Sequence, residues 1–157
     1  MYLKIKKGRH RSNWWFPRLT FKDSIEGKVT FMGDQEYSIG KYQKDSNKLI
    51  GLSDGFHHHI SSIRLGFRWN SILKRIDLVG ICYNNRKREI KVITRVDVNK
   101  EINFSVSIEK DKYLVNIDGE LVSFDRSSRW NFLRYTLKPF FGGVSKAPKD
   151  LEFKILL

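Results

Sequence analysis

The sequence predicts an all-β fold, a two-sheet antiparallel sandwich of the jelly-roll kind, on three observations. Apolar and polar residues alternate without a fault over residues 102–109, which is typical of a strand with one solvent-exposed face. Asp118-Gly119 separates two further strand-like runs, and both residues suit the positive φ angles of a tight hairpin turn. No segment has a convincing helical period, which argues against a fold of alternating strands and helices.

About ten short strands are expected along the chain, as in sandwiches and jelly rolls. They are residues 18–22, 28–32, 62–70, 73–83, 89–96, 102–109, 113–117, 120–124, 133–140 and 151–156, with a tight turn at Asn84-Asn85. Residues 7–17, 34–48 and 145–150 read as irregular loops, where binding groups tend to be mounted. No repeat, linker or low-complexity tract divides the 157 residues, so a single domain spanning 1–157 is expected.

The charge of the chain is strongly positive. Thirty Lys and Arg against 17 Asp and Glu give a formal charge of +13, and residues 1–22 hold seven basic residues and no acid. This excess favours an anionic partner, either a small molecule, a nucleotide, an acidic glycan or a nucleic acid. The alternative is a solvated surface charge that only keeps the protein in solution.

Cys82 is the single cysteine, so no intrachain disulfide can form, and its apolar neighbours indicate a buried structural thiol. No run approaches the roughly 18 apolar residues of a membrane span, so no membrane partner is expected. The first residues lack the apolar stretch of a signal peptide, which predicts a cytoplasmic location unless a signal has been removed.

Residues 62–70 are the most informative segment. Alternation places Ile63 and Leu65 on the core face of a strand and Arg64 and Arg68 on the other face, roughly 13 Å apart at the strand rise. Gly66 between them predicts a basic trough with a floor of bare main chain. Arginine suits such a place because its planar fork binds phosphate or carboxylate in a bidentate way. The alternative is that both arginines pair with acids on neighbouring strands.

Three consecutive histidines lie just before that strand. His57 and His59 would share a strand face with a spacing that suits Zn²⁺, but only His10 and Asp54 are candidates for a third ligand, and the basic surroundings disfavour a cation. We therefore expect no metal and no cofactor. Histidines can instead hydrogen-bond an anion or transfer protons, or they can be structural.

Enzyme signatures with a fixed spacing are missing: there is no Gly-rich phosphate loop, no Gly-x-Ser-x-Gly and no suitably spaced pair of carboxylates. A metal-free cleavage remains chemically possible, with His10 or His58 as acid and base and Arg64 on the developing charge.

Aromatic residues could stack on sugar rings or bases. Trp14, in the run Trp14-Trp15-Phe16, is an even choice between ligand and core, whereas Trp69 favours the core.

Four segments in order resemble an uncharacterised family of concanavalin-like β-sandwich proteins found in Bacteroidota and their phages. They are KKGRHRS (6–12), NKLIGLSDG (47–55), HHISSIRLGFRW (58–69) and LKPFFGG (137–143) followed by Ala147-Pro148. The resemblance implies the jelly-roll fold and no established activity. It maps the family's histidine pair on His58 and His59, and this chain has Lys149 where the family often has histidine. A looser similarity is to jelly-roll polysaccharide lyases of the alginate-lyase type, which implies a trough holding Arg64, Arg68, His58 and Tyr135.

These observations predict a binding module for an anionic ligand, nucleotide-like or an acidic glycan, on a basic concave sheet face. The expected ligand-binding residues are His10, Trp14, His58, His59, Arg64, Arg68 and Lys138. If the chain is phage-encoded, capture of a nucleotide signal would be a natural use. The alternatives are a metal-independent enzyme that cleaves a polyanion, resembling a polysaccharide lyase or a phosphodiesterase, and a structural or attachment protein.

Overall fold

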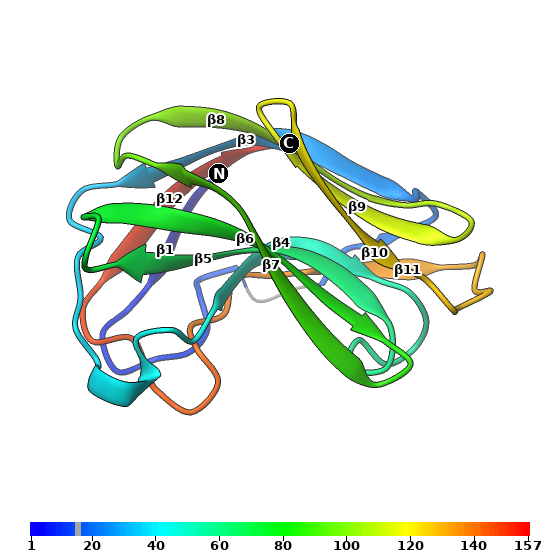
Figure 1. Cartoon of the computed structure of the whole chain (residues 1–157), viewed down its shortest axis with the longest axis horizontal. Coiled ribbons are helices and arrows are strands. Elements are labelled where there is room, and N and C mark those ends of the chain that lie inside the picture. The colour runs from blue at the N-terminus through cyan, green and yellow to red at the C-terminus, as the bar shows by residue number, and fades with distance from the viewer. Residues whose placement is uncertain (15–16) are drawn as a thin grey trace.

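The computed structural model describes residues 1–14 and 17–157, and two antiparallel sheets of six strands face each other in it (Figure 1). Sheet A has the strand order β1-β12-β3-β8-β9-β10, and sheet B has the order β2-β11-β4-β5-β6-β7. The strands of sheet A are β1 (Tyr2–Ile5), β3 (Ser24–Met32), β8 (Glu101–Ile108), β9 (Lys112–Ile117), β10 (Glu120–Asp125) and β12 (Leu151–Leu156). Those of sheet B are β2 (Leu19–Thr20), β4 (Asn47–Ser53), β5 (Ser62–Asn70), β6 (Arg75–Asn84), β7 (Lys87–Val96) and β11 (Arg134–Leu137). The predicted all-β sandwich is confirmed.

The hydrophobic core lies between the sheets. Phe31 and Phe153 of sheet A pack against Phe67 of sheet B, with ring centroids 5.1 and 5.2 Å from that of Phe67. Inward-facing residues of β8, among them Ile102 and Val106, are fully buried, as their alternation predicts. The described residues include a single short 3₁₀ helix, Gly40–Tyr42, and no helix long and apolar enough to cross a membrane.

Two hairpin turns follow from local sequence. Asp118 and Gly119 have φ angles of 47° and 94° and join β9 to β10, as expected for a tight turn. The turn between β6 and β7 lies one residue later than expected, at Asn85 and Arg86, whose φ angles are 50° and 69°.

β4 was not expected from the sequence, which placed an irregular segment up to residue 48. Six of its seven residues are buried, so the strand lacks the polar face whose alternation reveals a strand. Gly51 is needed within it because an added Cβ would lie 2.2 Å from the carbonyl oxygen of Ile63 on β5. β1 was also missed, since four residues are too few for a clear pattern.

The segment after β1 links the two sheets along one side of the sandwich. Isolated β-bridges join Ile5 to Ser12, Arg11 to Phe140, and Phe140 to Lys48 at the start of β4. The basic N-terminal segment is thereby held between the edge of sheet A and sheet B.

Candidate functional site

A cavity of about 600 Å³ lies against the face of sheet B that points away from the core. We call it the basic cavity. It is lined by Arg11, Pro17, Lys48, His58, His59, Arg64, Tyr83, Arg88, Tyr135, Thr136, Leu137, Lys138, Phe140, Gly142 and Gly143. None of these described residues is acidic, and five of them are Lys or Arg. The volume is in the range typical of ligand sites.

Arg64 lies in the basic cavity on β5, with only 6% of its surface exposed. Its side chain lies across Gly51 of β4, where an added Cβ would be 2.7 Å from the Arg64 Cγ. Within the described part of the chain it forms no ion pair, and its buried Nε has no hydrogen-bond partner. Burial lowers the pKa of Arg64 to about 10. A buried cation without a counter-charge is costly, so an anion placed beside Arg64 would stabilise it.

Lys48 is a second cation of the basic cavity, and its side chain is half-buried. Its Nζ donates to the carbonyl oxygen of Gly142 at 2.7 Å and lies 5.8 Å from the centre of the Phe140 ring. Burial, together with repulsion from Arg64 and Arg88, lowers the pKa of Lys48 to about 8. An anion bound beside it would reverse this shift.

His58 and Tyr135 meet at one wall of the basic cavity. The Tyr135 hydroxyl lies 3.0 Å from His58 Nδ1, 3.2 Å from the His58 backbone nitrogen and 3.2 Å from the Phe56 carbonyl oxygen. All three contacts are satisfied when the hydroxyl donates to Phe56 and accepts from both His58 nitrogens, which leaves the lone pair of the ring on Nε2. Burial, followed by repulsion from Arg64, lowers the pKa of His58 to about 4. The imidazole is therefore neutral near pH 7.

The two neighbouring histidines differ in position. His59 lines the basic cavity with its ring centroid 5.3 Å from that of Tyr83, and burial and the charge of Arg64 lower its pKa. His57 lies outside that lining and accepts a hydrogen bond from the backbone nitrogen of His59 through Nδ1. Across residues 1–14 and 17–157 no three His, Cys, Asp or Glu side chains gather as a metal site.

Arg68 does not share the basic cavity with Arg64. Its Nε lies 3.2 Å from Asp77 of β6, and its guanidinium also donates to the carbonyl oxygen of Lys44. The alternative of a cross-strand ion pair therefore describes Arg68, and it does not describe Arg64. The expected bare floor at Gly66 needs correction too, because an added Cβ there would lie 2.5 Å from Ile81 Cδ1: that side chain already fills the space.

Two other expected ligand residues lie outside the lining of the basic cavity. The Nδ1 atom of His10 donates to the carbonyl oxygen of Phe141 at 2.9 Å, and its ring stacks on Phe140, outside the lining of the basic cavity. Trp14 is 8% exposed and belongs to the core, and Trp15-Phe16 lie outside the described residues. Lys138 lines the basic cavity as expected.

Sequence reasoning did not single out Lys48, Tyr83 and Arg88. They come from three strands, and the register of sheet B places them near Arg64. Tyr83 of β6 pairs with Arg88 of β7, and Lys48 of β4 forms a bridge with Phe140, which also lines the cavity. The segment 47–55 was noted as one of the resembling motifs, and Lys48 is its second residue. No signal in the sequence pointed to Arg88.

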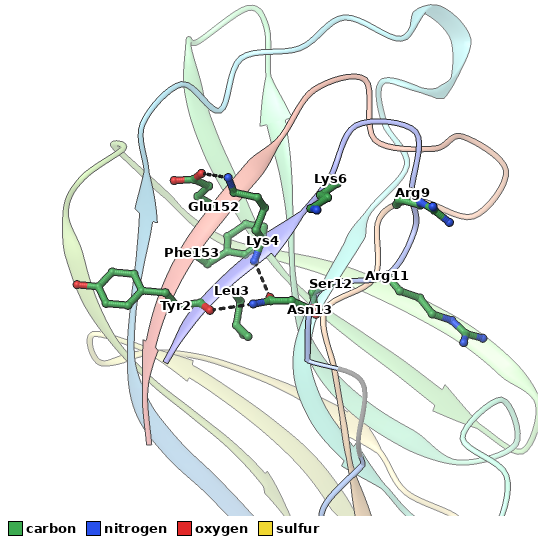
Figure 2. Close-up of a pocket in the computed structure, with 10 residues that line it drawn as sticks. All are labelled: Tyr2, Leu3, Lys4, Lys6, Arg9, Arg11, Ser12, Asn13, Glu152 and Phe153. Atoms are coloured by element: carbon green, nitrogen blue, oxygen red, sulfur yellow. Dashed lines mark hydrogen bonds and ion pairs between the residues drawn. The ribbon is translucent and has the colours of Figure 1, made fainter.

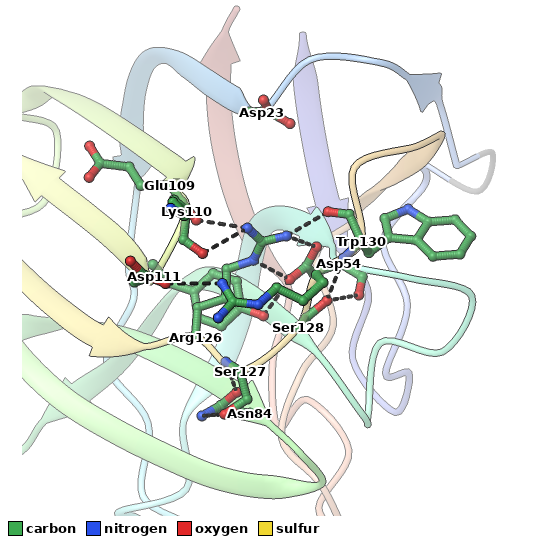
Figure 3. Close-up of polar contacts among 12 residues, drawn as sticks. Asp23, Asp54, Asn84, Glu109, Lys110, Asp111, Arg126, Ser127, Ser128 and Trp130 are labelled. Carbon is green, nitrogen blue, oxygen red and sulfur yellow. Dashed lines mark hydrogen bonds and ion pairs between the residues drawn. The ribbon is translucent and has the colours of Figure 1, made fainter.

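A buried polar network anchors the loop that carries the histidines (Figure 3). Asp54 is fully buried at the start of this loop and accepts hydrogen bonds from Arg126 at 2.7 and 3.0 Å, from Arg134 at 2.7 Å and from the Tyr113 hydroxyl at 2.6 Å. Arg134 also pairs with Asp23. Burial alone would raise the pKa of Asp54, but the hydrogen bonds and the two guanidinium charges outweigh it and hold that pKa below its usual value. All acceptor capacity of Asp54 is used, so it is a positioning residue for the loop and is unsuited to metal binding.

Solved structures with the same fold include enzymes that act on glycans. Alginate lyase AlyC3 in complex with dimannuronate superposes with a TM-score of 0.67 at 10% identity, over 98% of this chain and 71% of that chain. A family 7 alginate lyase, A1-II', in complex with substrate gives 0.58 at 10% identity over 85% and 57%, and a family GH16 endo-β-1,3(4)-glucanase gives 0.55 at 15% identity over 90% and 56%. This chain thus spans little more than half the length of the latter two proteins.

No family model and no curated protein matches the sequence. At these identities the structural similarity shows the fold, a jelly-roll sandwich of the concanavalin-like kind, and the residues of the neighbours do not transfer to this chain.

Proposed function

We propose that the basic cavity binds the acid groups of an anionic glycan, with Arg64 as the central contact. The observation that carries the proposal is the state of Arg64: it is almost fully buried, it has no acidic partner among the described residues, and its Nε is unsatisfied. A carboxylate or sulfate placed beside it would supply both the missing charge and the missing hydrogen-bond acceptor.

The rest of the lining suits a sugar acid. Lys48, Arg88 and Lys138 add positive charge around Arg64, and Phe140 adds an apolar ring surface. Sugar rings bind to such combinations because their C–H faces pack on aromatic rings while their polar groups are hydrogen-bonded. The glycan-acting neighbours of the fold support this ligand class over a nucleotide. The resemblance to the family found in Bacteroidota and phages stays a prediction. Capture of a nucleotide signal also stays a prediction, and the titration with a dinucleotide described below tests it.

A second candidate function is cleavage of that glycan by β-elimination, favoured by the neutral His58 beside Tyr135. His58 Nε2 would take the proton from the carbon next to the carboxylate. The electrons of the broken C–H bond would form a C=C bond as the neighbouring C–O bond breaks. The leaving oxygen would take the Tyr135 proton, which the protonated His58 then restores. Arg64 beside the carboxylate would stabilise the charge that develops there.

The proposal is tested by calorimetric titration with dimannuronate and with a dinucleotide, using Arg64→Ala and the matched variant Arg68→Ala. Both arginines lie on the same face of β5, but only Arg64 lies in the basic cavity. Losing a hydrogen-bonded partner of a desolvated anion costs about 2–5 kcal/mol, so Arg64→Ala should weaken dimannuronate binding by ~30-fold or more. Arg68→Ala should bind like the wild type.

Equal losses in both variants would overturn the assignment of the site, and tighter binding of the dinucleotide would overturn the ligand class. Binding and catalysis are separated by incubating wild type and His58→Ala with alginate and recording the ultraviolet absorbance of the conjugated double bond. Conversion by the wild type alone, with binding retained in His58→Ala, would establish the lyase.

A further inference from the structure

A second depression, which we call the N-terminal groove, lies beside the basic cavity and has a volume of about 630 Å³. It is lined by Tyr2, Leu3, Lys4, Lys6, Arg9, Arg11, Ser12, Asn13, Glu152 and Phe153 (Figure 2). Its volume is again in the range of ligand sites. Leu3 and Phe153 lie at its base, but their side chains are buried in the core.

Three cations in the N-terminal groove, Lys6, Arg9 and Arg11, form no ion pair among the residues that the structure describes, although the charge of Lys6 is close enough to Asp150 to help lower the pKa of that carboxyl. Lys4 differs, because its Nζ lies 2.7 Å from Glu152. Arg9 and Arg11 extend to the same side of the segment, away from the Lys4–Glu152 pair (Figure 2). Two of the three cations without an ion pair, Arg9 and Arg11, therefore lie on one side of the N-terminal groove.

That side adjoins the basic cavity. Arg11 lines both depressions, and its bridge to Phe140, which lines the basic cavity, fixes their relative position. The bridge between Ile5 and Ser12 holds the segment that carries Arg9 and Arg11 against the end of β1. The cations of the N-terminal groove and Arg64 of the basic cavity thus belong to two depressions that share Arg11.

We propose that the N-terminal groove holds further residues of the same anionic polymer whose acid group binds at Arg64, so that the protein recognises a length of polyanion and Arg11 spans the junction. This inference rests on the proposed function of the basic cavity. A ligand confined to the cavity would leave Arg9 without an acidic neighbour and Lys6 with only the exposed Asp150, whereas a polymer that continues past Arg11 gives each of them an acid group. Evenly spaced acid groups along one chain are what acidic glycans offer.

The test compares dimannuronate with hexamannuronate in calorimetric titrations of the whole chain. The variant is Lys6→Ala combined with Arg9→Ala. The control is Lys100→Ala combined with Lys110→Ala, which removes two exposed lysines that line neither depression. The control also corrects for the greater number of binding registers that a longer oligomer has.

We expect the Lys6/Arg9 variant to lose about tenfold in hexamannuronate affinity, in line with two exposed ionic contacts. Its dimannuronate affinity should stay within about twofold of the wild type, since neither altered residue lines the basic cavity. The control should keep the length preference of the wild type.

An equal change for both oligomers, or no change for either, would overturn the inference and leave the proposal for the basic cavity intact. Failure of Arg64→Ala to weaken dimannuronate would instead overturn the proposed function, and the inference with it.

Discussion

Replacing Asp54 by Asn should destabilise the protein strongly. The carboxylate is fully buried, and the two guanidinium groups that it pairs with, those of Arg126 and Arg134, are 8% and 2% exposed. Removing one partner of a buried ion pair costs about 3–5 kcal/mol, because the remaining charges stay buried and uncompensated. For a chain of this length each ~1 kcal/mol shifts the melting temperature by about 2–4 °C, so we expect a loss of about 6–20 °C.

Thermal unfolding followed by circular dichroism at pH 7 measures this loss. The matched control is Asp111→Asn, which breaks an exposed ion pair with Arg129 and should cost at most about 1 kcal/mol. Equal melting temperatures of the wild type and Asp54→Asn would refute the argument that the network holds the fold.

The same network predicts a pH dependence. The pKa of Asp54 is lower in the folded than in the unfolded state, so its contribution is fully present above the unfolded value of about 4 and is lost as the pH falls through the folded value. The stability gap between wild type and Asp54→Asn should therefore be constant near neutral pH and shrink in acid. A gap that is the same at neutral and strongly acidic pH would contradict the lowered pKa.

Two further predictions concern the basic cavity. Gly51→Ala should destabilise the protein by about 1–3 kcal/mol and weaken dimannuronate binding, because its Cβ would lie 2.2 Å from a backbone oxygen that cannot move aside and 2.7 Å from Arg64. A variant that melts and binds like the wild type would show that β4 and β5 are less closely packed. Dimannuronate affinity should fall as the pH rises through about 8, because free Lys48 loses its proton there, and binding at pH 8 should take up protons. Titrations in two buffers of different ionisation enthalpy measure the uptake, and Lys48→Met should abolish it; a wild-type affinity that is constant from pH 7 to 9 would exclude this role of Lys48.

Strands could be predicted from the sequence where one face of the strand is exposed to solvent. Ile102 and Val106 alternate with polar residues and define β8, and Asp118-Gly119 defines a hairpin by its own backbone preferences. β4 could not be found in this way, because a strand buried on both faces shows no alternation.

The site was predictable only in part, because its residues meet through the register of the sheet. Arg64 and Arg68 are equivalent in sequence, four residues apart on one strand face. They differ because Arg68 lies opposite Asp77, whereas Arg64 lies opposite Ile81 on one side and Gly51 on the other. Which residue stands across a strand depends on turn lengths and bulges along the whole sheet, and local pattern does not give it. The sequence predicted a basic site at Arg64, but the residues of other strands that complete the cavity, such as Lys48 and Arg88, were not foreseeable.

The strand order also determines when the parts of the cavity can form during synthesis. β4, β5, β6 and β7 are consecutive both in the chain and in sheet B, so the strand with Arg64 can pair with its neighbours while later residues are still missing. β12 lies between β1 and β3, so the N-terminal strand finds its neighbour only after the far end of the chain has been made. Tyr135 and Lys138 are added late as well. The cavity is therefore completed last. Its final parts are the early segment with Arg11 and the late segment with Tyr135 and Lys138, which join the strand that carries Arg64.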